Sequence, residues 1–132
     1  DQRVRVDATE AEGSWGEGWY RVAPAPEDLV VKKRGYSAFA GTELDTVLRG
    51  NGIRTLAVAG FSTEASVESI ARAGFERGYY VVVVGDGTAS TRPGSHEAAL
   101  TTIGALFGTV VHADEVARLW RTKAPGQAAR AR

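Results

Sequence analysis

The feature that most restricts the fold is a pair of apolar strands, each followed by a helical pattern. The stretch 53–59 has little polar alternation and the stretch 79–84 has none, as expected for strands in a sheet that is covered on both faces. Apolar residues at helical spacing follow over 63–77 and again over 95–106. Strands that alternate with helices in this way predict βαβ units, and therefore an α/β fold with a parallel sheet.

Shorter elements complete this alternation. The predicted order is a strand within 28–33, a helix over 43–50, a strand over 53–59, a helix over 63–77, a strand over 79–84, a helix over 95–106, a strand over 108–111 and a helix over 113–120. Residues 1–27 are polar with several Gly and Pro breakers, and their aromatic residues Trp15, Trp19 and Tyr20 are expected to pack on a neighbouring surface. Residues 121–132 carry four basic residues and no acidic one, which predicts a flexible basic tail.

Composition limits the classes of function. The 132 residues have room for one domain, and 16 basic residues balance 16 acidic ones, so net charge gives no reason to expect nucleic acid or membrane as a partner. No apolar run approaches the roughly 20 residues that a membrane helix needs. The absence of cysteine excludes disulfides and thiolate metal sites and fits a cytoplasmic location. Two histidines, His96 and His112, make a poor metal site without further ligands, so we expect no metal and no cofactor.

Three polar positions follow predicted strands, at the edge of a parallel sheet where sites usually form. They are Lys33, the turn from Gly60 to Ser66, and Asp86. Ser66 falls in the first turn of a helix, where unpaired N–H groups and the helix dipole favour developing negative charge. Asp86, which lies between two glycines, is more easily explained as a turn cap than as a site carboxylate. His96, near a helix start, is more easily explained by capping or packing than by ligand binding.

Several ordered motifs carry a family resemblance over roughly residues 13–120. They are the segments 13–16, 28–39, 41–49, 60–69, 78–90 and 96–100. With these motifs the chain resembles the isochorismatase-like cysteine hydrolases. The Lys-x-x-Tyr-Ser-x-Phe pattern that starts at Lys33 looks most like the ureidoacrylate amidohydrolase branch. The resemblance implies a three-layer αβα Rossmann-like parallel sheet and assembly as a homo-oligomer, a dimer or a tetramer.

The resemblance also implies a catalytic triad of Asp, Lys and Cys that hydrolyses small amides or ureido acids. The family's Lys matches Lys33, and its nucleophile position matches Ser66. A non-proline cis peptide is implied between Phe61 and Ser62, with the oxyanion hole formed around these two residues and Ala65. Tyr36 and Phe39 are expected to line the substrate pocket because they follow Lys33 in the sequence, and Thr63 is assigned to the same pocket. A pocket or an interface stays open for Trp120, and an interface is the alternative for Tyr36 and Phe39.

Two departures from the family pattern limit this interpretation. The nucleophile position holds Ser66, and a hydroxyl needs a strong nearby base where a thiol does not. Three explanations stay open: an engineered Cys→Ser change, a natural loss of activity, or a working Ser enzyme with neutral Lys33 as the base.

The second departure is that the strand bearing the family's catalytic Asp is not found. The upstream acidic residues, Asp1, Asp7, Glu10 and Glu12, match no such motif. The family's sheet order places two further strands between the predicted strand in 28–33 and that over 53–59. Residues 1–120 are therefore expected to be the C-terminal part of one domain, whose first strands come from an N-terminal segment or another chain.

The leading hypothesis is a hydrolase of small amide or ureido substrates, with Ser66 at the nucleophile position and Lys33 as base or electrostatic partner. One alternative is a catalytically inactive family member that acts in assembly or small-ligand binding. Another is an isochorismate-type vinyl-ether hydrolase, whose chemistry needs an acid and no nucleophile.

Overall fold

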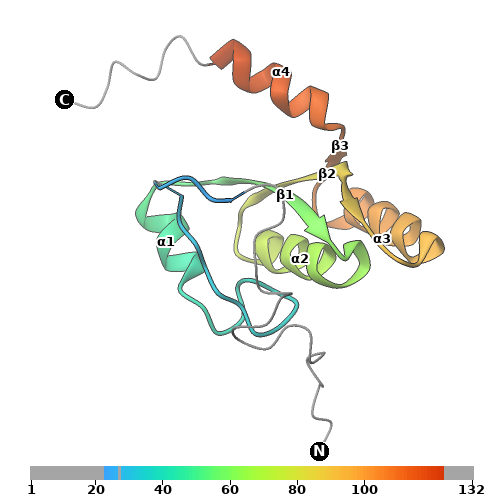
Figure 1. The fold of residues 1–132 in the computed structure, drawn as a ribbon, viewed down its shortest axis with the longest axis horizontal. Coiled ribbons are helices and arrows are strands. Elements are labelled where there is room, and N and C mark those ends of the chain that lie inside the picture. Colours follow the sequence, from blue (N-terminus) through green and yellow to red (C-terminus); the bar gives the residue numbers. More distant parts are fainter. Residues whose placement is uncertain (1–22, 27, 124–132) are drawn as a thin grey trace, which may run out of the picture. The chain divides into compact units, whose positions relative to one another are not determined.

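The computed structural model describes residues 23–26 and 28–123. A boundary between Val30 and Val31 divides it into two units, and all helices and strands belong to the second unit. Their order is α1 Leu44–Gly50, β1 Thr55–Phe61, the π-helical turn η3 Thr63–Val67, α2 Glu68–Glu76, β2 Tyr80–Ala89, α3 Pro93–Leu106, β3 Thr109–Val111 and α4 Ala113–Lys123 (Figure 1).

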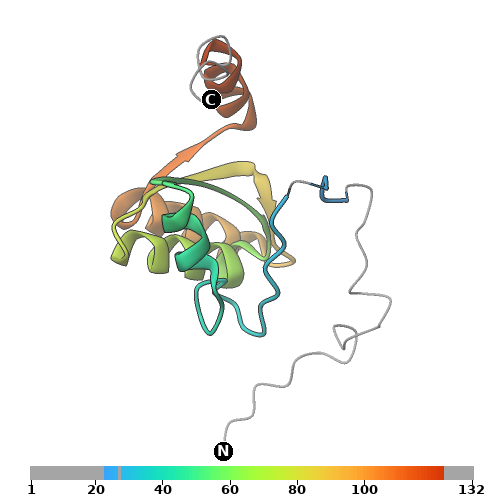
Figure 2. The same cartoon turned by 90° about the vertical axis from the view of Figure 1, so that its left-hand side faces the viewer.

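The strands form a parallel sheet in the order β1-β2-β3. Thr55 pairs with Tyr80 at the start of the β1–β2 ladder, and Val82 pairs with Thr109 at the start of the β2–β3 ladder. Helices α2 and α3 connect these strands and lie along the same face of the sheet, as Figures 1 and 2 show. Both crossover connections have the same handedness and run in the same direction across the sheet, so their helices pack on the same face. The parallel α/β fold is therefore confirmed.

The core lies between this face of the sheet and the two helices. Alternate strand residues point into it, because successive side chains of a strand face opposite ways. The buried cluster consists of Val58, Val67, Ala71, Val81, Val83 and Ile103. The strands supply three of these residues, and the helical segments supply the other three, so the hydrophobic pattern alone explains how α2 and α3 pack on the sheet.

The opposite face of the sheet is more open than the apolar sequence of its strands predicts. Ala57 and Ala59 of β1 are exposed, and Tyr80 of β2 is 72% exposed. Within the described residues, β1 is also an edge strand with one neighbour. An apolar run indicates that a surface is suited to burial, but it does not say which segment covers it.

The strand expected within 28–33 does not form. These residues have no regular secondary structure, and the Leu29 side chain is 69% exposed. A β-branched run becomes a strand only when a neighbouring strand accepts its backbone hydrogen bonds. The described residues supply no such neighbour, so local propensity was an insufficient guide here.

Element boundaries differ more modestly. Strand β2 continues past Val84 to Ala89, and α3 begins at Pro93, before the expected cap at Ser95. Helix α4 runs to Lys123, three residues beyond its expected end. The predicted packing of Trp15, Trp19 and Tyr20 lies outside the described residues, as does the tail beyond position 123. In the described part of the chain, no helix is both long enough and apolar enough to cross a membrane.

Candidate active site

The turn after β1 places Ser66 at the start of a continuous helical segment. The strand ends at Phe61, the Phe61–Ser62 peptide bond is cis, and Ser62 is extended. This cis bond lies where the family resemblance placed one. The η3 turn follows, with the Val67 N–H donating to the Ser62 carbonyl at 3.2 Å. Ser66 thus lies in the first turn, where backbone N–H groups lack partners within the helix.

The sequence explains this local path. Thr63, Val67 and Ala71 recur every four residues, and all three are buried. They therefore hold one side of η3 and α2 against the sheet. Just before the turn, Gly60 has φ +135°, a conformation that side chains other than glycine's rarely adopt. The anchored helical face and this glycine together aim the chain from β1 into the turn.

Lys33 lies next to Ser66, although 33 residues separate them in sequence. Its Nζ is 3.4 Å from the Ser66 Oγ and donates to the Gly35 carbonyl at 2.9 Å. The structure thus brings the two predicted catalytic residues together and favours Lys33 over its neighbour Lys32 as the cation of the site. Within the described residues, no carboxylate pairs with Lys33.

Thr63 is fully buried, with 0% of its surface exposed. Its Oγ1 lies 3.0 Å from the Ala89 carbonyl oxygen and 2.8 Å from His96 Nδ1. The hydroxyl is therefore engaged by the end of β2 and by α3. The pocket role predicted for Thr63 is not one that this buried side chain can fill.

Glu64 makes a second connection to the same region. The Ser90 hydroxyl donates to Glu64 Oε1 at 2.9 Å, and the Arg92 N–H donates to the Ser90 oxygen at 2.9 Å. The backbone N–H of Glu64 lowers the pKa of its carboxyl, and Ser90, Arg92 and His96 act in the same direction against the effect of burial. Glu64 Oε2 is buried and has no hydrogen-bond partner among the described residues. Among the described residues, Ser90 is thus the one side chain that donates a hydrogen bond to the Glu64 carboxylate.

Tyr36 and Phe39 have different environments. Tyr36 is exposed, whereas Phe39 is 6% exposed and packs against the Tyr79 ring with the Arg77 guanidinium 4.9 Å from its centroid. Proximity to Lys33 in the sequence suggested a pocket role for Phe39. The structure corrects this interpretation, because the chain turns after Gly35 and takes Phe39 into the core.

Asp86 caps a helix, and its hydrogen-bond partners lie in and next to α4. Its Oδ1 accepts the Ala113 N–H at 2.8 Å at the start of α4, and His112 Nδ1 lies 3.5 Å from its Oδ2. The bond from the Ala113 N–H is the largest cause of the lowered pKa of Asp86. The turn expected at Asp86 does not form, because β2 continues to Ala89, and Asp86 instead caps a helix that starts 27 residues later.

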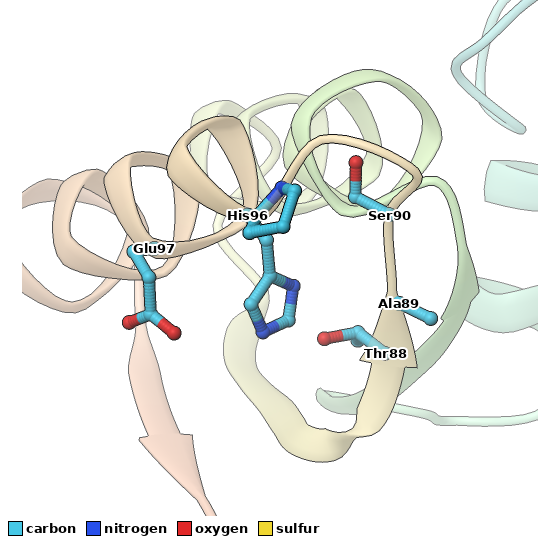
Figure 3. Close-up of a pocket in the computed structure, with 6 residues that line it drawn as sticks. Thr88, Ala89, Ser90, His96 and Glu97 are labelled. Carbon is cyan, nitrogen blue, oxygen red and sulfur yellow. The ribbon is translucent and has the colours of Figure 1, made fainter.

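A shallow pocket of about 230 Å³ lies at the end of β2 and the start of α3 (Figure 3). It is lined by Thr88, Ala89, Ser90, Pro93, His96 and Glu97. None of the predicted site residues lines this pocket. Ser90 and Glu97 were not predicted from the sequence as residues of a site. In the described part of the chain, no cluster of His, Cys, Asp or Glu could hold a metal ion.

Comparison with known proteins gives a consistent result. The isochorismatase domain model matches residues 1–115. A ureidoacrylate amidohydrolase, RutB, of Methylobacterium radiotolerans is 42% identical over 102 residues, which cover 76% of this chain and 40% of that relative. The chain spans less than half the length of the curated relatives it matches.

Solved structures agree in fold. An isochorismatase-like hydrolase from Alkaliphilus metalliredigens superposes with a TM-score of 0.77 at 33% identity, covering 82% of this chain and 60% of that one. The nicotinamidase PncA of Bacillus subtilis superposes with a TM-score of 0.60 at 35% identity, covering 62% and 45%. With the domain match over most of its length, this chain belongs to the isochorismatase family of hydrolases.

Proposed function

We propose that this protein hydrolyses a C–N bond in small amide or ureido substrates, with residue 66 as the nucleophile position and Lys33 as its electrostatic partner. The observation that carries the proposal is the 3.4 Å approach of Lys33 Nζ to Ser66 Oγ at the start of a helix. The family relatives named for ureidoacrylate and nicotinamide support this substrate class. Ureido acids are the first choice within it, because the ureidoacrylate relative shares 42% identity with this chain.

The reaction would proceed through an acyl-enzyme. The residue 66 side chain attacks the carbonyl carbon and passes its proton to a carboxylate, which delivers it to the leaving nitrogen; water then releases the acyl group. The Lys33 ammonium favours the anionic nucleophile. Backbone N–H groups in the first helical turn, that of Ala65 included, are the candidate donors to the developing oxyanion.

The geometry suits a thiolate better than an alkoxide. A cation and a helix N-terminus ionise a thiol readily, whereas serine needs a strong base. Within the described residues, Lys33 is the one basic group placed at Ser66. We therefore propose that Ser66 occupies a cysteine site, and that the Ser form is weakly active or inactive.

The carboxylate is proposed to come from an N-terminal segment of the domain or from another chain. In the part of the chain that the structure describes, one edge of β1 is unpaired, and Ala57, Ala59 and Tyr80 are exposed. The proposed segment would cover this surface. Because buried edge groups need hydrogen-bond partners, strands added there would stabilise the sheet. A sample whose intact mass equals these 132 residues alone, and which melts cooperatively as a monomer, would contradict this proposal.

The decisive assay compares Ser66, Ser66→Cys and Ser66→Ala in a form that carries the proposed N-terminal segment. The substrates are ureidoacrylate, nicotinamide and other small ureido acids and amides. We expect the Cys form to turn over at least one of them and the Ala form to be inactive. Turnover by the Ala form at the rate of the Cys form would exclude a nucleophilic role for residue 66.

A second candidate function is binding without turnover. It is favoured by the hydroxyl at position 66 and by the lack of a carboxylate paired with Lys33 in the described residues. No turnover by any of the three forms, together with measurable substrate binding by calorimetry, would support this function instead.

A further inference from the structure

Two contacts of the Thr63 hydroxyl restrict where its proton can go. Its oxygen lies 3.0 Å from the Ala89 carbonyl oxygen and 2.8 Å from His96 Nδ1. A carbonyl oxygen can only accept a hydrogen bond, and a hydroxyl has one proton to donate. If that proton is donated to Ala89, the Thr63 oxygen must accept a hydrogen bond from His96, so His96 Nδ1 must carry a proton.

Burial makes this arrangement costly to break. Thr63 is fully buried, so neither of its partners can be replaced by solvent without opening the turn. An unpaired buried polar group costs more free energy than a typical hydrogen bond contributes. The pair of contacts therefore holds Thr63 in one place.

This connection fixes the turn that presents Ser66. Thr63 begins η3, and Ser66 follows three residues later in the same turn. The Glu64–Ser90 hydrogen bond of 2.9 Å joins the next residue of the turn to the same region. Figure 3 shows His96 with Ala89 and Ser90 at the junction of β2 and α3.

We propose that His96 is a positioning residue: it keeps its proton on Nδ1, donates it to Thr63 and so holds the turn that carries residue 66. The proposal rests on the proposed function only for its catalytic consequence. His96 acts through Thr63, and the geometry gives it no contact with Ser66 itself.

The first test is the tautomer of His96 in the unmodified protein. It is read from the imidazole ¹⁵N chemical shifts at a pH high enough for the ring to be neutral. We expect a protonated Nδ1 and a bare Nε2, with His112→Gln used to assign the signals, since the chain has two histidines. A ring protonated on Nε2 alone would overturn the proposal, because Thr63 would then donate to His96. This measurement needs no activity.

The second test measures how well residue 66 is positioned, in the Ser66→Cys background. An asparagine amide can place its N–H near the Nδ1 position, whereas a glutamine amide reaches toward the Nε2 position. We therefore expect His96→Asn to retain kcat and the rate at which iodoacetamide alkylates the introduced thiol. His96→Gln and His96→Leu should lower both by roughly ten- to a hundredfold with little change in KM, since a misplacement of about 1 Å has effects of this size.

Melting temperatures of the three variants separate positioning from loss of fold. Unchanged alkylation and kcat in a folded His96→Leu variant would overturn the positioning role. If no form hydrolyses any substrate, the proposed function fails, while the tautomer and the alkylation rates still decide the role of His96.

Discussion

At the scale of single residues, the contact between Lys33 and position 66 gives the site its chemistry. A cation 3.4 Å from a side-chain oxygen stabilises negative charge there, and a helix N-terminus adds to this effect. A hydroxyl gains little from this environment near neutral pH, but a thiol gains much. The nature of residue 66 therefore decides what the same geometry can do.

This argument predicts a reactive thiol in Ser66→Cys. Its pKa should lie at least about one unit below the usual value near 8.5, and Lys33→Met should move it back toward that value. The pH dependence of alkylation by iodoacetamide measures it. Lys32→Met is the matched control and should leave the thiol pKa low. An ordinary pKa in the Ser66→Cys protein would mean that Lys33 does not act on this position.

At the scale of elements, the close packing of β2 against its neighbours limits which residues can replace the glycines around it. A Cβ placed on Gly108, at the turn between α3 and β3, would overlap the backbone and Cβ of Val81. On Gly104, inside α3, the nearest atom would be Val110 Cγ2 at 3.7 Å, an ordinary contact distance. The packing therefore excludes a Cβ at Gly108 but leaves room for one at Gly104.

Gly108→Ala should lower the free energy of unfolding by about 1–3 kcal/mol, because the backbone must shift to admit the methyl group. Gly104→Ala should leave it unchanged or raise it by up to about 1 kcal/mol, since alanine is the better helix former. Urea unfolding measures both. Equal effects of the two substitutions would show that the α3–β3 turn is not as closely packed as described.

The start of α4 depends on a carboxylate from another element. Asp86 of β2 accepts the Ala113 N–H, a group that has no partner inside the helix. Asp86→Ala should therefore increase amide hydrogen exchange in the first turn of α4. Asp114→Ala, at an exposed position of that turn, is the control. Unaltered exchange in Asp86→Ala would show that the helix does not need this cap.

At the scale of the whole molecule, three carboxylates connect stability to pH. Hydrogen bonds from Tyr79, then Arg49, lower the pKa of Asp45, the Ala113 N–H lowers that of Asp86, and the backbone N–H of Glu64 lowers its own. A pKa that is lower in the folded state means that the ionised group stabilises the fold. This contribution is present above the ordinary carboxyl pKa and is lost as pH falls through the folded value.

The urea midpoint should accordingly stay nearly constant from pH 7 to about pH 5 and fall below about pH 4. The triple amide variant of these carboxylates should have a lower midpoint at pH 7 and a weaker fall in acid. A control triple has the same change in charge: Glu43→Gln, Glu76→Gln and Asp114→Asn. If both triples kept the full acid dependence of the parent protein, these three carboxylates would not be its source.

The sequence predicted most of the fold because periodic apolar residues decide which faces are buried. The elements from α1 to α4 lie near their predicted positions, although α1 has no buried residue. The match of Lys33 to the lysine of the family predicted which lysine meets Ser66. The predicted strand within 28–33 failed because pairing needs a partner that a local pattern does not reveal.

The surroundings of the site were harder to predict. The pocket role of Phe39 was predicted from its closeness in sequence to Lys33, and Thr63 was assigned to the same pocket, but tertiary contacts bury both side chains. The contacts of Thr63 with His96 and of Glu64 with Ser90 join residues 33 and 26 positions apart, and nothing in their local sequence indicates such pairs.

The central claim, that position 66 is a nucleophile served by Lys33, is tested most directly by trapping the acyl-enzyme. The Ser66→Cys protein, in the form used for the assay, would be mixed with a substrate that it turns over, quenched in acid and analysed by peptide mass spectrometry. The account predicts the acyl mass on the sulfur introduced at position 66, and much less of it when Lys33→Met is added. Turnover that leaves no adduct at position 66, and that persists in Ser66→Ala, would contradict the claim.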